Sequence, residues 1–313
     1  MALIWVVGEL NVDIIVQDKN LAPEPGKEKL VEECRLALGS SSAITAAAAA
    51  GLGHEVRMVS VVGSDRFGRF VLEELEKLGI DTTYVTVSDR IRTGVTVSLS
   101  DGRDRALLTY AGSIGEVSPA YIPEAVGENG DHLHFGSYFL QTGMRGHWAD
   151  LLRRAKSRGM TTSFDTGWDV SGQWQTDEIG GLLAVTDFFM PNEEEFVHLF
   201  GGNSVEEAMD RLPARRGNIA VKLGAKGCLL IRPDGETVFR PSFPVQPVDT
   251  TGAGDSFNAG LIHGIVSGMD IEEALDFANA SGALAVLRIG GADGVPDRAA
   301  VEAWMRSHQS GKA

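Results

Sequence analysis

The stretch DTTGAGDSFNAG at residues 249–260 runs directly into an apolar, helix-like segment at 257–265. Small residues before a helix let its first backbone N–H groups point into one concavity, where the helix dipole also attracts an anion. Asp255 would lie in the first turn, beside this anion site. From spacing alone it is either a helix N-cap or a general base that takes a proton from an attacking hydroxyl.

Strand-like and helix-like segments alternate along the rest of the chain. The predicted strands are 3–7, 56–62, 132–135, 161–164, 187–190 and 219–223, and the predicted helices are 42–52, 66–78, 144–158, 193–200 and 205–212. This alternation predicts one α/β domain over residues 1–313, with a central, mostly parallel sheet flanked by helices. Such sheets usually bind ligands beyond the carboxyl ends of their strands.

Two segments, about 12–38 and 92–110, interrupt this alternation. Both show strand-like patterning with turns, at Pro25-Gly26 and Asp101-Gly102, and neither contains a good helix. We expect a small β-sheet that projects from the domain as a lid or a dimerisation surface. The alternative is a set of extra strands at the edge of the main sheet.

Composition and missing motifs narrow the function. The chain has 28 Lys+Arg against 43 Asp+Glu, a formal charge of −15, so we expect no nucleic-acid partner. The sequence contains neither a P-loop motif nor a GxSxG elbow, and no intact GxGxxG follows the first strand. A phosphate site must therefore use another motif, and the stretch 249–260 is the candidate.

The histidines, cysteines and apolar runs suggest an ordinary cytoplasmic protein. Cys34 and Cys228 are far apart and form no CxxC, which favours unpaired thiols. His132 and His134 could share a strand face as zinc ligands, but ordinary strand packing is the preferred interpretation. The N-terminus lacks a basic segment, and the alanine run at 46–50 is too short to cross a bilayer, so we expect no membrane association.

The stretch 249–262, DTTGAGDSFNAGLI, resembles the C-terminal signature of the ribokinase-like (PfkB) carbohydrate kinase family. Weaker resemblances follow in the family's order, at 8–13 (GELNVD), 93–94 (TG), 191–195 (PNEEE), 223–227 (LGAKG) and 290–292 (GGA). The resemblance implies a ribokinase-like fold with a β lid and an ATP-dependent sugar kinase that requires Mg²⁺. It implies Asp255 as the general base and the backbone amides of Gly252, Ala253 and Gly254 as an anion hole.

The same resemblance assigns further residues to ligands. It implies substrate contacts at Asn11, Asp13, Gly39, Ser40 and Ser41. It implies nucleotide contacts at Asn192, Lys222, Gly224, Gly227 and Asn279, with Glu195 beside Mg²⁺ and Asp249 beside a monovalent cation such as K⁺. Structural alternatives stay open: Asn192 as a helix cap, Glu195 and Asn279 as solvated side chains, and Lys222 and Lys226 as surface lysines.

Departures from the family pattern leave the acceptor open. Ser40 stands where the family usually has its second glycine, and Ile44 where it usually has an asparagine. Trp168 and Trp174 could stack on a substrate ring, although packing of their loop against the domain is the simpler interpretation. The leading expectation is a kinase of a small sugar. The alternatives are a nucleoside kinase, a ring-alcohol kinase and a catalytically silent sugar-binding relative, and the lid also suggests a homodimer.

Overall fold

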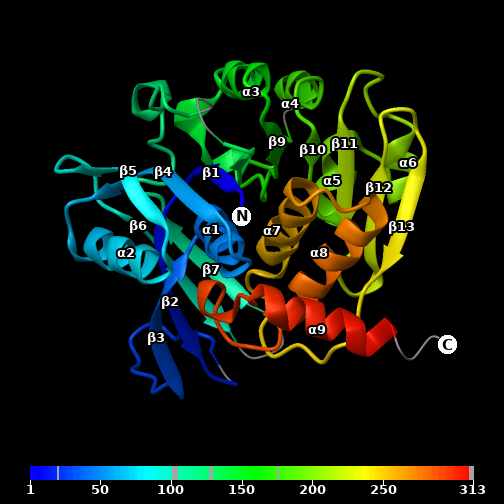
Figure 1. Cartoon of the computed structure of the whole chain (residues 1–313). Coiled ribbons are helices and arrows are strands. Elements are labelled where there is room, and N and C mark those ends of the chain that lie inside the picture. Colours follow the sequence, from blue (N-terminus) through cyan, green and yellow to red (C-terminus); the bar gives the residue numbers. More distant parts are fainter. Residues whose placement is uncertain (20, 101–104, 127–129, 175, 310–313) are drawn as a thin grey trace.

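A nine-stranded sheet forms the centre of the computed structural model, which describes residues 1–19, 21–100, 105–126, 130–174 and 176–309 (Figure 1). Its order is β13-β12-β11-β10-β9-β8-β1-β4-β5. The strands are β1 Leu3–Val7, β4 Glu55–Gly63, β5 Asp81–Ser88, β8 His132–Phe135, β9 Thr161–Phe164, β10 Phe188–Phe189, β11 Asn218–Lys222, β12 Gly227–Ile231 and β13 Thr237–Pro241. Only the pairs β11–β12 and β12–β13 are antiparallel, which confirms the mostly parallel sheet.

Helices cover both faces of this sheet. They are α1 Ser41–Gly51, α2 Arg66–Lys77, α3 Trp148–Ser157, α4 Thr176–Leu183, α5 Glu193–Phe200, α6 Val205–Met209, α7 Ala253–Val266, α8 Ile271–Ala285 and α9 Arg298–Gln309. One-turn 3₁₀ helices occupy Pro119–Tyr121, Tyr138–Leu140, Thr142–Met144, Gly224–Lys226 and Ala292–Gly294.

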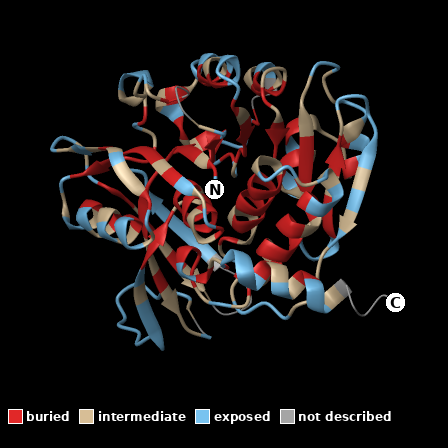
Figure 2. Cartoon of the chain, in the orientation of Figure 1, coloured by how far each residue is buried: buried red, intermediate tan, exposed pale blue. Residues whose placement is uncertain are grey.

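Alternation along β1 shows how the sheet separates two cores. Ile4 and Val6 pack with side chains of α1, α2, α7, α8 and α9, whereas Trp5 and Val7 pack with side chains of α3 to α6. Since successive strand residues point to opposite faces, a fully apolar strand is required at the centre of a two-sided sheet. Figure 2 shows the buried residues concentrated on the sheet and on the inner sides of the helices.

A separate four-stranded sheet forms the lid, in the order β3-β2-β6-β7. Its strands are β2 Asn11–Gln17, β3 Glu33–Gly39, β6 Gly94–Ser100 and β7 Arg105–Tyr110. The prediction of a small β-sheet separate from the main one is therefore confirmed, and the alternative of extra strands on the main sheet is wrong. The turn at Pro25-Gly26 is present, whereas the one at Asp101-Gly102 lies outside the described residues.

Some predicted boundaries were wrong for identifiable reasons. The helix predicted at 144–158 begins only at Trp148, because Thr142–Met144 is a 3₁₀ turn and Gly146 takes a left-handed φ of 79°. The helix predicted at 205–212 ends at Met209, a few residues before Pro213, which disfavours helical backbone before it. The strand predicted at 187–190 is reduced to Phe188–Phe189.

The structure also tests the expectations about the cysteines, the histidines and membrane-spanning segments. Cys34 and Cys228 are both free, as predicted. His132 and His134 are buried in the sheet, where each accepts or donates a hydrogen bond at 2.7–2.8 Å with the Ser163 hydroxyl, so ordinary strand packing is confirmed. Within the described residues there is no cluster of three metal-ligating side chains and no helix long and apolar enough to cross a membrane.

Candidate active site

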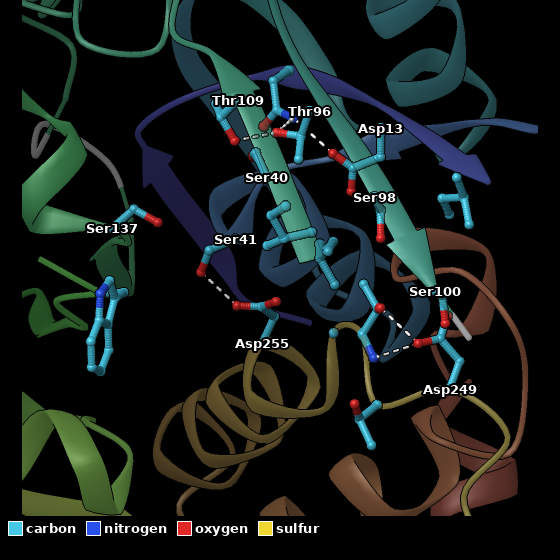
Figure 3. Close-up of a pocket in the computed structure, with 18 of the residues that line it drawn as sticks. Asp13, Ser40, Ser41, Thr96, Ser98, Ser100, Thr109, Ser137, Asp249 and Asp255 are labelled. Atoms are coloured by element: carbon cyan, nitrogen blue, oxygen red, sulfur yellow. Dashed lines mark hydrogen bonds between the residues drawn. The ribbon is translucent and has the colours of Figure 1, made fainter. Parts of the chain in front are cut away.

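A cavity of about 480 Å³ lies between the lid and the start of α7 (Figure 3). Its lid side is lined by hydroxyl groups from β6 and β7, namely Thr96, Ser98, Ser100 and Thr109. Its opposite side is lined by the first residues of α1, the loop 247–252 and Asp255. A cavity with so many hydroxyl groups suits a ligand that itself carries several hydrogen-bonding groups.

Asp255 lies in the first turn of α7, as predicted, and its carboxylate faces the cavity. The Ser41 hydroxyl donates a hydrogen bond of 2.5 Å to it (Figure 3). Burial raises the pKa of Asp255 to about 7, and the nearby charge of Asp165 adds to this rise. A carboxyl group with a pKa near neutrality can both accept and release a proton, which is what a general base requires.

Gly252 begins α7 in the left-handed conformation, with φ 78°, and no side chain caps the helix. A Cβ at this position would lie only 3.0 Å from both the Gly291 Cα and the Ile44 Cγ2. Glycine is therefore required by conformation and by space. Among the residues that the structure describes, no side chain caps the first N–H groups of α7, so this end of the helix is suited to an anion.

A polar chain that the sequence analysis missed lies behind Asp255. Asp165 is buried and accepts hydrogen bonds from the Ser137 amide at 2.8 Å and the Asn258 Nδ2 at 2.7 Å. Asn258 in turn accepts from the Lys222 Nζ at 3.1 Å. Two signals could have found these residues: Asp165 directly follows a buried strand, and Asn258 lies three residues after Asp255, on the same side of the helix.

Lys222 is brought beside the start of α7 by this chain. Its Nζ lies 3.4 Å from where a Cβ on Gly254 would be. The expected anion hole and a cation therefore lie together at the start of α7. Lys226, by contrast, is exposed and pairs with Glu193 at 3.1 Å.

Asn11 and Asp13 lie on β2 and line the cavity, as predicted for substrate-binding residues. The Asn11 Nδ2 donates to the Asp13 Oδ1 at 2.9 Å and to the Thr96 hydroxyl at 3.3 Å. Gly39 lies opposite Asn11 in the lid, and a Cβ there would overlap the Asp13 carboxylate at 2.2 Å. Gly39 therefore makes room for Asp13 and does not itself line the cavity.

Glu9 is a second buried acid that the sequence analysis did not single out. It lines the cavity and accepts a hydrogen bond from the Ser42 hydroxyl at 2.7 Å, and the Gln141 amide also donates to it. Burial raises the pKa of Glu9 to about 7. Its position directly after the first buried strand was the available signal.

Asn192 and Glu195 form a reciprocal cap at the start of α5. The Glu195 amide donates to the Asn192 Oδ1 at 2.8 Å, and the Asn192 amide donates to the Glu195 carboxylate at 3.0 Å. Asn192 is thus a helix cap, whatever its further role. Glu195 is buried, which raises its pKa, so the alternative of a solvated acid is wrong.

The remaining nucleotide-side residues are spread over β11 to β13 and α8. Gly224 has φ 58°, and a Cβ there would have no described atom within 4 Å. Gly227 has φ 119°, and a Cβ there would overlap the Arg240 carbonyl oxygen. Asn279 is buried, and its Nδ2 donates to the Arg240 and Pro241 carbonyls at 3.2 and 3.3 Å. The solvated alternative for Asn279 is therefore wrong, since its amide joins α8 to β13.

Asp249 connects two loops at the edge of the cavity. One carboxylate oxygen accepts from the Thr251 amide at 2.9 Å and the Thr251 hydroxyl at 2.7 Å, and the other accepts from the Gly290 amide at 2.9 Å. The loop before α7 is thereby fixed to the loop after α8.

The two tryptophans have different surroundings. Trp174 is buried and stacks on His198 at 4.9 Å between ring centroids, so the packing interpretation is correct for this residue. Trp168 is 51% exposed and lines the cavity.

Comparison with known proteins agrees with this geometry. The family model described as pfkB family carbohydrate kinase matches residues 1–298. The chain belongs to this family. It is therefore a phosphotransferase with an alcohol group as acceptor.

Individual relatives span nearly the whole chain. It is 33% identical to the ATP-dependent ribose-1-phosphate kinase of Halopiger xanaduensis, over 97% of this chain and 98% of that protein. It is 30% identical to the ribokinase of Bacillus subtilis, over 96% and 99% of the two chains. A structure assigned as ribokinase II from E. coli, in complex with ATP and Mg²⁺, superposes with a TM-score of 0.85 at 25% identity, covering 98% and 100% of the chains.

Ser40 and Ile44 are the two positions at which the sequence analysis expects departures from the family pattern, and the structure gives both a physical role. Ser40 has φ 83° and ψ 138°, a conformation that costs a residue other than glycine about 1–3 kcal/mol. Its hydroxyl accepts from the Ala43 amide at 2.8 Å and donates to the Glu9 carbonyl at 2.7 Å, so Ser40 caps α1.

Ile44 is buried beneath the two loops that Asp249 connects. Its Cγ2 and Cδ1 lie 3.0 Å and 2.4 Å from where Cβ atoms on Gly252 and Gly291 would be. The side chain lines the cavity with hydrocarbon and cannot hydrogen-bond an acceptor.

Proposed function

We propose that the chain is an ATP-dependent, Mg²⁺-requiring kinase of a small sugar, with Asp255 as the general base. The observation that carries this proposal is the position of Asp255. Its buried carboxyl group lies at the uncapped N-terminus of α7 and faces a cavity lined by hydroxyl groups. A proton acceptor beside an anion site is the arrangement that phosphoryl transfer to an alcohol needs.

In this proposal the acceptor lies under the lid, with one hydroxyl at Asp255. Asn11 and Asp13 hold other hydroxyls, and Ser41 orients the Asp255 carboxylate. Asp255 takes the proton as the hydroxyl attacks. The amides of Gly252, Ala253 and Gly254, with Lys222 beside them, stabilise the charge that develops on the transferred phosphoryl group. The lid excludes water, which would otherwise compete as acceptor.

The residues present fit ATP and Mg²⁺. ATP with Mg²⁺ supplies the phosphoryl group and neutralises part of its charge. The uncapped start of α7 and the Lys222 Nζ offer donors to the phosphates, and Glu195 offers a carboxylate oxygen of the kind that Mg²⁺ prefers. We assign Asn192, Gly224, Gly227 and Asn279 to the nucleotide side, and Asp249 with the loop at 290–291 to a monovalent cation.

The direct test is ADP release from Mg·ATP with a panel of pentoses, hexoses, sugar acids, sugar phosphates, polyols and nucleosides. Asp255→Asn should reduce turnover by about a hundredfold or more, since general-base catalysis contributes roughly that factor, while ATP binding is kept. Asp89→Asn is the matched control, because Asp89 is exposed and outside the cavity lining. Near-normal turnover of Asp255→Asn would refute the assigned base.

A nucleoside is the second candidate acceptor, because of Trp168. Its half-exposed indole lines the cavity and could stack on a base, and Ile44 adds an apolar wall. The hydroxyl groups of β6 and β7 favour the sugar. Competition between ribose and adenosine for binding distinguishes the two, since the tighter ligand identifies the class. A catalytically silent sugar-binding relative would not need a buried base. If no acceptor in the panel gave ADP release, that result would favour the silent relative.

We also propose that the lid mediates a homodimer. Leu36, Leu108 and Tyr110 are exposed on the lid, and β7 is an edge strand of the described sheet. Exposed apolar side chains beside an open strand edge are typical of an interface.

A further inference from the structure

Glu9 is a buried acid at the cavity that the proposed mechanism does not use. It lies between β1 and β2, and its carboxylate accepts hydrogen bonds from the Ser42 hydroxyl at 2.7 Å, from the Ser42 amide at 3.4 Å and from the Gln141 side-chain amide. Its backbone carbonyl accepts from the Ser40 hydroxyl at 2.7 Å. Ser40 has φ 83°, a conformation that persists only where surrounding contacts impose it. Glu9 therefore fixes the first turn of α1 with both its side chain and its backbone.

Ser41 lies between these two serines and faces the start of α7. Its hydroxyl donates to the Asp255 carboxylate at 2.5 Å (Figure 3). Consecutive residues of one helical turn move together, so a shift or rotation of this turn would displace all three hydroxyl groups. By fixing Ser40 and Ser42, Glu9 also fixes the direction in which Ser41 points.

Two glycines make room for this arrangement. A Cβ on Gly8 would lie 2.0 Å from the Ser42 Oγ. A Cβ on Gly136 would lie 3.1 Å from the Ser41 Oγ and 3.3 Å from the Ser42 Oγ. Each of these side chains would press on the hydroxyl groups, so glycine at both positions lets the two serines reach their carboxylates.

Glu9 influences Asp255 in two opposite ways. Burial and the charge of Asp165 raise the pKa of Asp255 to about 7, and the charge of Glu9 makes a smaller contribution in the same direction. The hydrogen bond from Ser41 and the charge of Lys222 lower this pKa. The Ser41 bond has a larger effect than the Glu9 charge. If loss of Glu9 also broke the Ser41 bond, the pKa of Asp255 would therefore rise rather than fall.

We propose that Glu9 is a positioning residue that fixes the first turn of α1, so that Ser41 orients the Asp255 carboxylate for proton transfer. Glu9 acts through this turn and does not bind the acceptor. The inference rests on the proposed function for the role of Asp255 as general base. The state of the Asp255 carboxyl group can, however, be measured without turnover.

The test is the pKa of Asp255, measured by NMR on the whole chain labelled at the aspartate carboxyl carbons, with the signal assigned by its absence in Asp255→Asn. Glu9→Ala removes the carboxylate, and Ser42→Ala breaks its link to α1 while keeping its charge. Both variants should raise the pKa above that of the unmodified protein, as Ser41→Ala should. Both should also lower kcat about tenfold, since a displaced catalytic group reacts more slowly, and should leave the KM for the acceptor within about twofold.

Glu9→Gln separates the position of this side chain from its charge. The Oε1 of Gln141 is buried and has no hydrogen-bond donor among the described residues, so rotation of its amide would let the substituted side chain keep this bond. Glu9→Gln should therefore keep the Ser41 bond, should not raise the pKa of Asp255, and should recover turnover relative to Glu9→Ala. Glu73→Ala is the matched control, because Glu73 is exposed and outside the cavity lining.

An Asp255 pKa that is unchanged or lowered in a folded Glu9→Ala or Ser42→Ala variant would overturn the proposal. So would a raised KM for the acceptor without a change in this pKa, because Glu9 would then bind the acceptor directly. Unfolding curves show which variants are folded, and Ser42→Ala keeps the test decisive if Glu9→Ala is not. If the pKa responds as expected but Asp255→Asn keeps normal turnover, the assigned base is refuted and the positioning of this carboxyl group by Glu9 stands.

Discussion

Asp255 shows how an unfavourable local environment can serve the chemistry. Three carboxyl groups, those of Glu9, Asp165 and Asp255, are buried close enough for their charges to influence one another. Desolvation, with repulsion from the Asp165 carboxylate, disfavours the ionised forms of Glu9 and Asp255 and raises their pKa values. The hydrogen bonds from Ser41, Ser42 and Asn258 offset part of this cost. What remains is a carboxyl group whose pKa is about 7, which suits the role of general base proposed for Asp255.

Turnover should therefore depend on pH in the neutral range. Asp255 must be ionised to accept the proton, so kcat should fall as the pH falls through about 7, the raised pKa of this group. A kcat profile measured from about pH 5 to about pH 9 checks this. A flat profile between about pH 6 and about pH 8, with chemistry shown to be rate-limiting, would contradict it.

The free energy of unfolding should change with pH in the opposite direction to kcat, falling as the pH rises. The folded-state pKa values of Asp255 and Glu9 are raised to about 7, so the folded protein binds more protons than the unfolded chain between about pH 4 and about pH 7. Their contribution is complete below the unfolded pKa values and is lost as the pH rises through about 7. In urea unfolding, Asp255→Asn should reduce this decline, because the contribution of Asp255 is then removed.

At the scale of elements, the start of α7 depends on a backbone that only glycine provides. The left-handed φ of Gly252 turns the chain into the helix, and the contact with Gly291 leaves no space for a side chain. Alanine-rich α1 and the glycines of α7 let helices pack closely on this side of the sheet, which brings Ser41 to Asp255.

Gly252→Ala should reduce turnover by about a hundredfold, since small displacements of catalytic groups have effects of that size. Gly268 provides a matched control at the other end of α7: it has φ 71° with no atom within 4 Å of an added Cβ. Both variants should lose about 1–2 kcal/mol of stability to the left-handed conformation. Only Gly252→Ala should lose activity, and equal kinetics in the two variants would show that the start of α7 is not a catalytic element.

At the scale of the whole molecule, we propose that the lid both closes the cavity and mediates assembly of the protein. β2 follows β1 after three residues, and β3 leads directly into α1, so the lid is attached where the cavity begins. One face of the lid carries the hydroxyl groups of the cavity (Figure 3). Leu36 and Leu108, which alternate with cavity-lining positions, lie on its other face.

Sedimentation equilibrium should give the mass of two chains, and Leu108→Glu should shift it toward one. Leu108 is 64% exposed, and a charge there would have to be buried in a lid-to-lid interface. Val170→Glu, at a position 78% exposed outside the lid, should leave the mass unchanged. A monomer at all concentrations tested would overturn the dimer proposal.

Much of the fold followed from local pattern. The strands at 3–7, 132–135 and 161–164 and the helix at 193–200 agree with the structure to the residue, because continuous apolar runs and a capping box are local signals. The lid was recognisable because two segments lacked helical periodicity. Asp255 was recognisable because glycine, helix start and carboxylate are adjacent in the chain.

The sequence by itself determined the α/β alternation, the separate lid and the glycine-rich start of the helix that carries Asp255. Only the tertiary structure decided that Asp165, Asn258 and Lys222 form one chain behind that carboxylate, and that Glu9 accepts a hydrogen bond from Ser42 at the start of α1. Residues brought together from distant elements leave no mark in a one-dimensional pattern, because the sheet order and the register that join them depend on the whole chain. The pKa of Asp255 is also decided only by the tertiary structure, since burial sets it and burial exists only in the folded protein.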